Sequence, residues 1–134
     1  MGGVDWETLK TAAIAASQNS YSPYSHFLVG VAGFVDDGRL VSGPNVENAS
    51  YGITLCAECS MISAPYASGG GRLTADYCVD GNRFPLMPCG RCRQLLFEHG
   101  GPELKIITLQ GVQTMAQILP QAFGPWDLET GFPG

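Results

Sequence analysis

The chain has 134 residues, of which 45% are hydrophobic and only 14% are charged, and its formal net charge is −5 at pH 7. This composition predicts one domain over residues 1–134 with a packed core, and it excludes a largely disordered chain. The acidic balance, without any basic stripe, argues against partners such as nucleic acid or an anionic membrane. The apolar runs are too short to span a bilayer. The low charge also favours a homo-oligomer.

The N-terminal sequence and the cysteines both indicate a cytoplasmic protein. Residues 1–6 (MGGVDW) lack the basic and apolar regions of a secretion signal. Five cysteines are an odd number, and four of them form two Cys-x-x-Cys pairs, which fits poorly with a secreted disulfide framework. We therefore expect reduced thiols that are available to a metal ion. Cys78 is the exception, because its apolar surroundings favour a small buried residue on a strand.

Apolar periodicity and turn residues divide the first half of the chain. A helix is predicted over residues 4–20, where apolar side chains recur at helical spacing. Residues 27–35 and 39–41 read as a β-hairpin around the turn Asp36-Asp37-Gly38. A polar loop at 45–51 leads into a helix near Leu55, which Pro65 is expected to end early or kink.

The second half continues the alternation of strands and helices. The predicted elements are a strand over 73–79, a helix over 88–99 closed by Gly100-Gly101, a strand over 104–109 and a short helix over 114–119. Residues 126–134 are weakly specified and are expected to form a loosely ordered tail. The alternation predicts an α/β fold, with helices on the faces of a layered sheet.

Two short motifs carry the strongest chemical signal. Cys56-Ala57-Glu58 is predicted at the start of one helix, and Pro88-Cys89-Gly90-Arg91-Cys92 at the start of another. Helix N-termini carry partial positive charge, which stabilises thiolates, so the two helix ends can bring three thiolates to one point. Three thiolates can hold a Zn²⁺ ion and leave its fourth tetrahedral position open, as in a hydrolytic site.

Glu58 follows the first of these thiols by two residues and completes the predicted site. A carboxylate there can take a proton from a metal-activated water and pass it to a substrate. The alternative is an ordinary glutamate in a first helical turn, where the helix dipole favours negative charge. The position between two groups of metal ligands favours the catalytic interpretation.

These motifs resemble the cytidine deaminase family in its small, three-cysteine form, whose signature includes Pro-Cys-x-x-Cys after a ligand-x-Glu pair. The resemblance extends to three flanking segments, at residues 21–30 (YSPYSHFLVG), 43–52 (GPNVENASYG) and 119–125 (LPQAFGP). It therefore covers nearly the whole chain. It implies a three-layer α-β-α sandwich around a mixed sheet of about five strands.

The resemblance also implies an activity, a cofactor and an assembly. The activity is the hydrolytic deamination of cytidine and 2′-deoxycytidine in pyrimidine salvage, with one Zn²⁺ per subunit held by Cys56, Cys89 and Cys92. A zinc-bound hydroxide would attack C4 of the base while Glu58 shuttles protons. The implied assembly is a homotetramer whose active sites are shared between subunits.

Roles for the substrate-binding residues follow from the same resemblance. Asn45 and Glu47 would hold the ribose hydroxyls, although an Asx-type turn explains the pair equally well without it. Phe27 would line the base pocket, or else belong to the core, and Ala57 would contact the base through its backbone. The residues expected to help build the pocket of a neighbouring subunit are Tyr51 and Phe123.

The chain departs from the family pattern in three places. The family commonly has arginine after the catalytic glutamate, and here that position is Cys59; Arg91 stands where a small residue is frequent. We hypothesise that Arg91 tunes the charge of the zinc site in place of the missing arginine. Pro65 is the third departure, and the sequence suggests no function for it.

Two alternatives remain open from the sequence. Cys59 could complete a closed four-cysteine structural zinc site in a binding module without catalysis. The same zinc core also suits a related deaminase that acts on blasticidin-type nucleosides.

Overall fold

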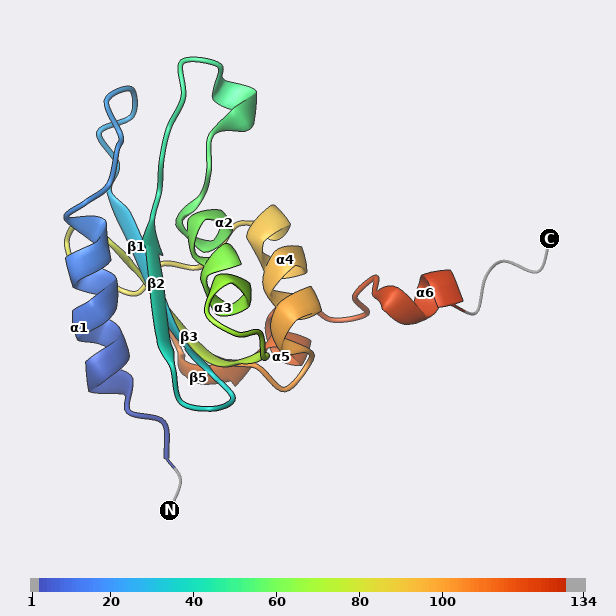
Figure 1. Ribbon diagram of the computed structural model, residues 1–134. Coiled ribbons are helices and arrows are strands. Elements are labelled where there is room, and N and C mark those ends of the chain that lie inside the picture. The colour runs from blue at the N-terminus through green and yellow to red at the C-terminus, as the bar shows by residue number, and fades with distance from the viewer. Residues whose placement is uncertain (1–2, 130–134) are drawn as a thin grey trace.

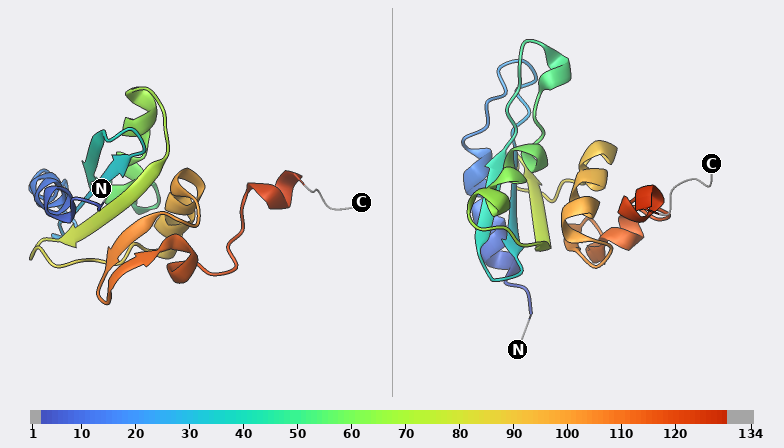
Figure 2. Two further views of the ribbon diagram at one scale, coloured as in Figure 1. Left: turned by 90° about the horizontal axis from the view of Figure 1, so that it is seen from below. Right: turned by 45° about the vertical axis from the view of Figure 1, so that its right-hand side comes forward.

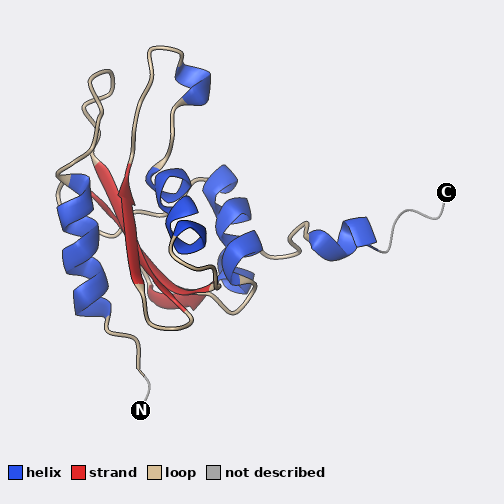
Figure 3. Cartoon of the chain, in the orientation of Figure 1, coloured by secondary structure: helices blue, strands red, loops and turns tan. Residues whose placement is uncertain are grey.

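The computed structural model describes residues 3–129, and within these residues five strands form one mixed sheet in the order β2-β1-β3-β4-β5 (Figures 1 and 3). The strands are β1 (Val29–Val35), β2 (Leu40–Pro44), β3 (Leu73–Asp80), β4 (Lys105–Thr108) and β5 (Gly111–Thr114). In the described sheet β3 and β4 run parallel, and each other neighbouring pair is antiparallel. The predicted hairpin is confirmed as β1 and β2.

Helices cover both faces of this sheet. The helical elements of the described residues are α1 (Trp6–Ser17), the 3₁₀ turn η1 (Tyr51–Ile53), α2 (Ala57–Met61), α3 (Ser63–Ala67), α4 (Gly90–Gly100), α5 (Met115–Ile118) and α6 (Pro125–Glu129). Helix α1 packs on one face, and α2 to α5 lie on the other (Figure 1). The predicted α-β-α sandwich is therefore confirmed. Among the described helices, none combines the length and apolar character that crossing a membrane requires.

Helix α1 lies within the predicted range of residues 4–20, is shorter at both ends, and packs closely on the sheet. Asp5 is its N-cap, because Oδ1 of Asp5 accepts a hydrogen bond of 3.1 Å from the backbone N–H of Thr8. Leu9 and Ala13 are fully buried against the sheet. Gly30 of β1 lies directly beneath, and a Cβ atom at that position would come within 2.0 Å of the carbonyl oxygen of Ala13. Glycine therefore sets the distance between this helix and the sheet.

On the opposite face, α2 and α3 are two short helices instead of one. The predicted effect of Pro65 is confirmed, because the helix is interrupted at Ile62. Proline has no N–H for the carbonyl of Met61, four residues earlier, so the regular ladder cannot continue. Gly43 of β2 lies under α2, where a Cβ atom would come within 2.7 Å of the backbone nitrogen of Met61. This close contact fixes the position of α2.

Strand β5 and helix α6, like the short turn η1, are absent from the sequence-based prediction. Strand β5 has four residues and follows a tight turn in which Thr108 Oγ1 donates to the carbonyl of Gly111 at 2.8 Å. Helix α6 lies where a loose tail is expected, and it projects from the body of the protein (Figure 2). Its Trp126 ring packs edge-on against Phe97 of α4, with centroids 5.6 Å apart. The expected tail beyond residue 129 lies outside the described residues.

Candidate active site

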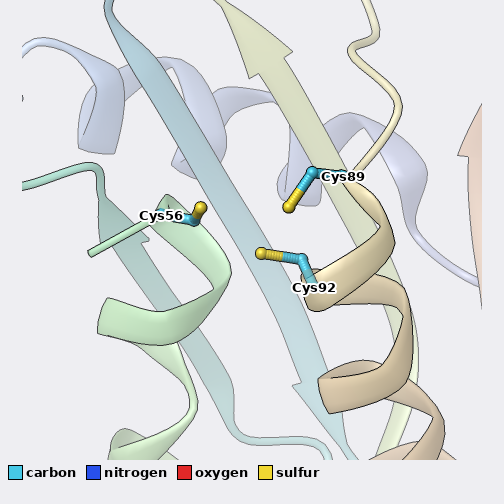
Figure 4. Close-up of side chains that lie close together, drawn as sticks. All are labelled: Cys56, Cys89 and Cys92. Carbon is cyan, nitrogen blue, oxygen red and sulfur yellow. The ribbon is translucent and has the colours of Figure 1, made fainter. Parts of the chain in front are cut away.

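Two helix N-termini bring three cysteines together. Cys56 is the N-cap of α2 and Cys89 is the N-cap of α4, while Cys92 lies in the first turn of α4. Their Sγ atoms all lie within 4.8 Å of one another and point to a common centre (Figure 4). Among the described residues, this is the group of side chains that can hold a metal ion.

The donor set fits zinc. Zn–S bonds of about 2.3 Å in a tetrahedral arrangement place thiolates about 3.8 Å apart, which the observed spacing allows. Cys59 lies one turn beyond Cys56, and its Sγ is not a member of this group. It instead accepts a hydrogen bond of 3.3 Å from Nη2 of Arg91. The geometry therefore supports three protein ligands and disfavours the closed four-cysteine alternative.

The protein environment shifts the pKa values of the three thiols in different directions. Burial raises the pKa of Cys56, and burial together with the Glu58 carboxylate raises the pKa of Cys92. Burial opposes ionisation of Cys89 as well, but hydrogen bonds outweigh it, notably from the backbone N–H of Cys92, and lower its pKa. Of the three thiols, only Cys89 therefore has a lowered pKa, so the expected stabilisation of thiolates does not extend to Cys56 and Cys92. Metal binding at Cys56 and Cys92 must therefore displace protons.

Glu58 is buried beside these thiols instead of pointing into solvent. Its side chain is only 3% exposed, and its Oε2 atom has no hydrogen-bond partner among the described residues. An ordinary glutamate in a first helical turn would be hydrated, so that interpretation does not fit. A buried carboxylate with an unpaired oxygen next to three thiols is suited to proton transfer.

Two further buried groups face Glu58 from β3. Cys78 is buried as the sequence predicts, but its side chain also lines the site, and burial followed by the charge of Glu58 raises its pKa well above the usual value. Asp76 is completely buried, and neither carboxyl oxygen has a hydrogen-bond partner in the described chain. Burial, and then the Glu58 carboxylate, raise the pKa of Asp76 well above its ordinary range.

A cavity of about 240 Å³ opens onto the thiols and Glu58. Three residues expected to bind substrate line it, namely Phe27, Asn45 and Ala57. Phe27 is 51% exposed, so the alternative of a core position is wrong. The other lining residues are Val29, Thr54, Leu55, Cys56, Glu58, Cys78, Leu86, Met87, Pro88, Cys89 and Cys92.

Glu47 and Tyr51 line an adjoining cavity of about 340 Å³, together with Tyr24, Ser25 and Thr54. Thr54 lines both cavities and so marks their boundary. The Tyr51 and Tyr24 rings lie 5.9 Å apart, centroid to centroid. The expected base contacts Phe27 and Ala57 thus line one cavity, and the expected sugar contact Glu47 lines the cavity next to it.

Phe123 and the two arginines of α4 lie outside these cavities. Phe123 is 57% exposed, and its carbonyl accepts a hydrogen bond of 2.8 Å from Gln94. Arg91 reaches from α4 to Cys59 and also donates to the carbonyl of Thr54 at 3.5 Å. Arg93 instead binds two backbone carbonyls, with Nε 2.8 Å from the oxygen of Pro88. Only Arg91 is therefore placed to influence the thiol cluster.

Several residues in or beside the site are missed by sequence reasoning. Cys78, which lines the cavity, and Asp76, which is buried beside Glu58, could have been found from the alternation of β3, since residues two apart on a strand share a face. Thr54 and Ser25 carry no signal of their own, because threonine and serine in polar loops are common. Their positions depend on how two distant loops meet.

The chain matches known proteins over most of its length. Residues 5–108 match the family model described as the cytidine and deoxycytidylate deaminase zinc-binding region. The chain is similar to the cytidine deaminase of Mycobacterium tuberculosis, with 55% identity over 128 residues that cover 96% of each chain. It is also 38% identical to the cytidine deaminase of Halalkalibacterium halodurans, over 93% of this chain and 98% of the other.

Solved structures show the same arrangement. The crystal structure of cytidine deaminase from Mycobacterium leprae superposes with a TM-score of 0.87 at 76% sequence identity, covering 89% of this chain and all, 100%, of the other. The structure from Mycobacterium tuberculosis gives a TM-score of 0.89 at 55% identity, over 91% and 99% of the two chains. Because this similarity spans the whole sandwich, including both cysteine-bearing helices, the chain is an enzyme of the cytidine deaminase family.

Proposed function

We propose that the protein catalyses the hydrolytic deamination of cytidine and 2′-deoxycytidine, giving uridine or 2′-deoxyuridine and ammonia. The observation that carries this proposal is the buried carboxylate of Glu58 in the same cavity as three convergent thiols. Cys56, Cys89 and Cys92 would hold one Zn²⁺ per subunit. When bound, the ion supplies an ionisable water at neutral pH.

Glu58 would do the proton transfer. Its unpaired Oε2 can accept a proton from the attacking water and deliver it to N3 of the cytosine ring. The same carboxyl group then carries a second proton to the departing amino group, so one water enters and one ammonia leaves. Burial at 3% exposure keeps bulk water from competing for these protons.

The two cavities suggest how a nucleoside lies in the site. The base would occupy the 240 Å³ cavity against Phe27, with the backbone of Ala57 at its edge. The sugar would extend toward Asn45 and then Glu47, across the boundary at Thr54. This orientation directs C4 of the base to the thiol cluster.

The proposal extends to assembly and location. We propose a homotetramer in which Tyr51 and Phe123 help to close the pocket of a neighbouring subunit. Both rings are largely exposed in the single chain, at 74% and 57%. Exposed aromatic residues are frequent at subunit interfaces. We also propose that the protein acts in pyrimidine salvage in the cytoplasm. Residues 1–134 would form one domain.

Arg91 would adjust the charge of the site. Three thiolates and Zn²⁺ sum to −1, which weakens the metal as a Lewis acid, so a nearby positive charge is useful. The guanidinium of Arg91 contacts Cys59, at the position where the family commonly has arginine. Arg91→Ala should weaken zinc retention or raise the pH at which the rate rises, and Arg91→Lys should lose less. A variant unchanged in both properties would contradict this role.

The central test measures turnover and zinc together. Purified protein should consume cytidine, followed by its absorbance, with about one zinc per chain. Glu58→Gln should lose at least about 100-fold in kcat while it keeps its zinc, because only the proton carrier is removed. Zinc-loaded wild-type protein that leaves cytidine unchanged would overturn the proposed function.

A further inference from the structure

The loop between α1 and β1 is fastened at its base by the side chain of Asn45. The Oδ1 atom of Asn45 accepts hydrogen bonds from the Ser20 hydroxyl and from the backbone N–H of Val29, the latter at 3.0 Å. Its Nδ2 atom donates to the carbonyl of Phe27 at 2.8 Å. These contacts use both acceptor positions of the amide and one of its two donors.

Glu47 fastens the tip of the same loop. Its Oε1 atom accepts the backbone N–H groups of Tyr24 and Ser25, at 3.0 and 3.1 Å. Its Oε2 atom accepts the hydroxyl of Ser25. Hydrogen bonds from the Ser25 hydroxyl and from the two N–H groups also lower the pKa of Glu47, so they favour the ionised carboxylate.

The direction of the Ser25 hydroxyl is determined by its second partner. Its Oγ atom accepts the backbone N–H of Phe27 at 3.0 Å. An ionised carboxylate can only accept, and a backbone N–H can only donate, so the hydroxyl proton must point to Glu47. Ser25 therefore connects the backbone of one expected base contact to the carboxylate of one expected sugar contact.

The bonds to Glu47 leave little capacity for a ligand. A carboxylate has about four acceptor positions, and the described loop uses three of them. The remaining position is on Oε2, the oxygen that Ser25 holds. A sugar hydroxyl that binds Glu47 must therefore approach the oxygen whose orientation depends on Ser25.

We propose that Ser25 is a positioning residue for sugar recognition, which holds Oε2 of Glu47 toward the sugar hydroxyl of the bound nucleoside. This inference rests on the proposed function, because it takes Glu47 as the sugar contact. Ser25 itself acts through Glu47 and takes no part in the chemistry at C4. Loss of the Ser25 hydroxyl should therefore weaken nucleoside binding more than it slows the proton transfer by Glu58.

The test compares Ser25→Ala with wild-type protein on two substrates, cytidine and 2′,3′-dideoxycytidine. Removal of the hydroxyl should raise KM for cytidine about tenfold, the scale of one hydrogen bond to a charged group, with kcat within about twofold. The change in kcat/KM for dideoxycytidine should stay within about twofold, because that substrate lacks the 2′- and 3′-hydroxyls that Glu47 would bind. Ser25→Thr, which keeps the hydroxyl, should restore most of the affinity for cytidine.

A double-mutant cycle separates positioning from a general effect on the loop. In the Glu47→Gln background, Ser25→Ala should add little, because the carboxylate that it orients is gone. Ser50→Ala is the matched control, since Ser50 is an exposed serine of the facing loop whose side chain makes no capping hydrogen bond. Three outcomes would overturn this inference and leave the proposed function standing. They are equal losses of kcat/KM on both substrates, losses that add to those of Glu47→Gln, and wild-type kinetics of Ser25→Ala. Wild-type protein without cytidine turnover would instead overturn the proposed function, and this inference with it.

Discussion

The two faces of the sheet are built on the same plan but hold very different side chains. On the α1 face, Leu9 and Ala13 pack against a cluster that includes Ala75 and Val79. On the other face, Leu96 and Met61 pack around Val31 in the same way. Each face also has a glycine at the closest approach of a helix, Gly30 under α1 and Gly43 under α2.

The difference lies in what is buried between the apolar residues. The face under α2 and α4 also buries Glu58, Asp76, Cys78 and Cys92, next to the partly buried Cys56 and the exposed Cys89. Burial of such groups costs free energy unless they are paired or bind a ligand. The α1 face thus contributes mainly to the packed core. On the opposite face, the buried polar groups lower the stability of the fold but form the candidate active site. Strand β3 contributes to both, because its side chains alternate between them.

The largest expected effect comes from removing a thiol of the reactive face. Cys56→Ala should lower zinc affinity at least about 100-fold, because it removes one of the three proposed protein ligands. Cys59→Ala, one helical turn away, should retain zinc, since its Sγ lies outside the ligand group. Metal analysis of both purified variants, after dialysis against a chelator, is the measurement. Zinc loss from both variants would instead support the alternative of a closed zinc site with four cysteine ligands.

Substitutions at Gly30 and Gly43 test the effects of packing on stability and on catalysis separately. An added Cβ overlaps backbone atoms at either position, 2.0 Å from Ala13 at Gly30 and 2.7 Å from Met61 at Gly43. Gly30→Ala and Gly43→Ala should both destabilise the fold, by about 1–3 kcal/mol or more. Only Gly43→Ala should also lower kcat of the folded fraction, up to about 100-fold, because it displaces the helix that carries Cys56 and Glu58.

Thermal melts and single-turnover rates on the two glycine variants distinguish these effects. If Gly30→Ala lowered the rate constant of the folded enzyme as much as Gly43→Ala, the division between the faces would be wrong.

A smaller effect is expected at Asp76, which is buried without a hydrogen-bond partner. Its pKa in the folded protein is raised by burial and by Glu58, so the folded state binds its proton more tightly than the unfolded chain. This contribution to stability is complete below the unfolded pKa of about 3.9 and is lost as the pH rises toward the folded value. Asp76→Asn should therefore stabilise the protein at neutral pH, by about 1 kcal/mol or more.

Urea denaturation at two pH values tests this prediction. The increase in the free energy of unfolding from Asp76→Asn should be larger at pH 8 than at pH 5, because keeping the buried wild-type carboxyl protonated costs more free energy at the higher pH. Asp80→Asn is the control at the end of the same strand, where Oδ1 already accepts two backbone N–H groups. That variant should show no comparable gain. A pH-independent difference for Asp76→Asn would exclude the ionisation argument.

Local sequence signals predicted the elements that are long or sharply bounded. The helix within residues 4–20, the turn at residues 36–38 and the interruption caused by Pro65 each depend on residues close in sequence. Strand β5 was missed because four largely exposed residues have no usable periodicity, and pairing with β4 is what makes them a strand. Helix α6 was missed for a similar reason, since its Trp126 is positioned by Phe97, far away in the chain.

The sequence by itself determined the candidate thiol ligands and the candidate proton-transfer carboxylate, because motif spacing places Cys56 and Glu58 on one helix turn and Cys89 and Cys92 on another. It also determined the fold class, through the alternation of strands and helices and the family resemblance. Only the tertiary structure decided which neighbours share their cavity. Asp76 and Cys78 face Glu58 because of the register of β3, and Ser25 reaches Glu47 because two loops, 22 residues apart at that contact, fold together. Such contacts depend on distances between elements, which packing sets and local sequence does not encode.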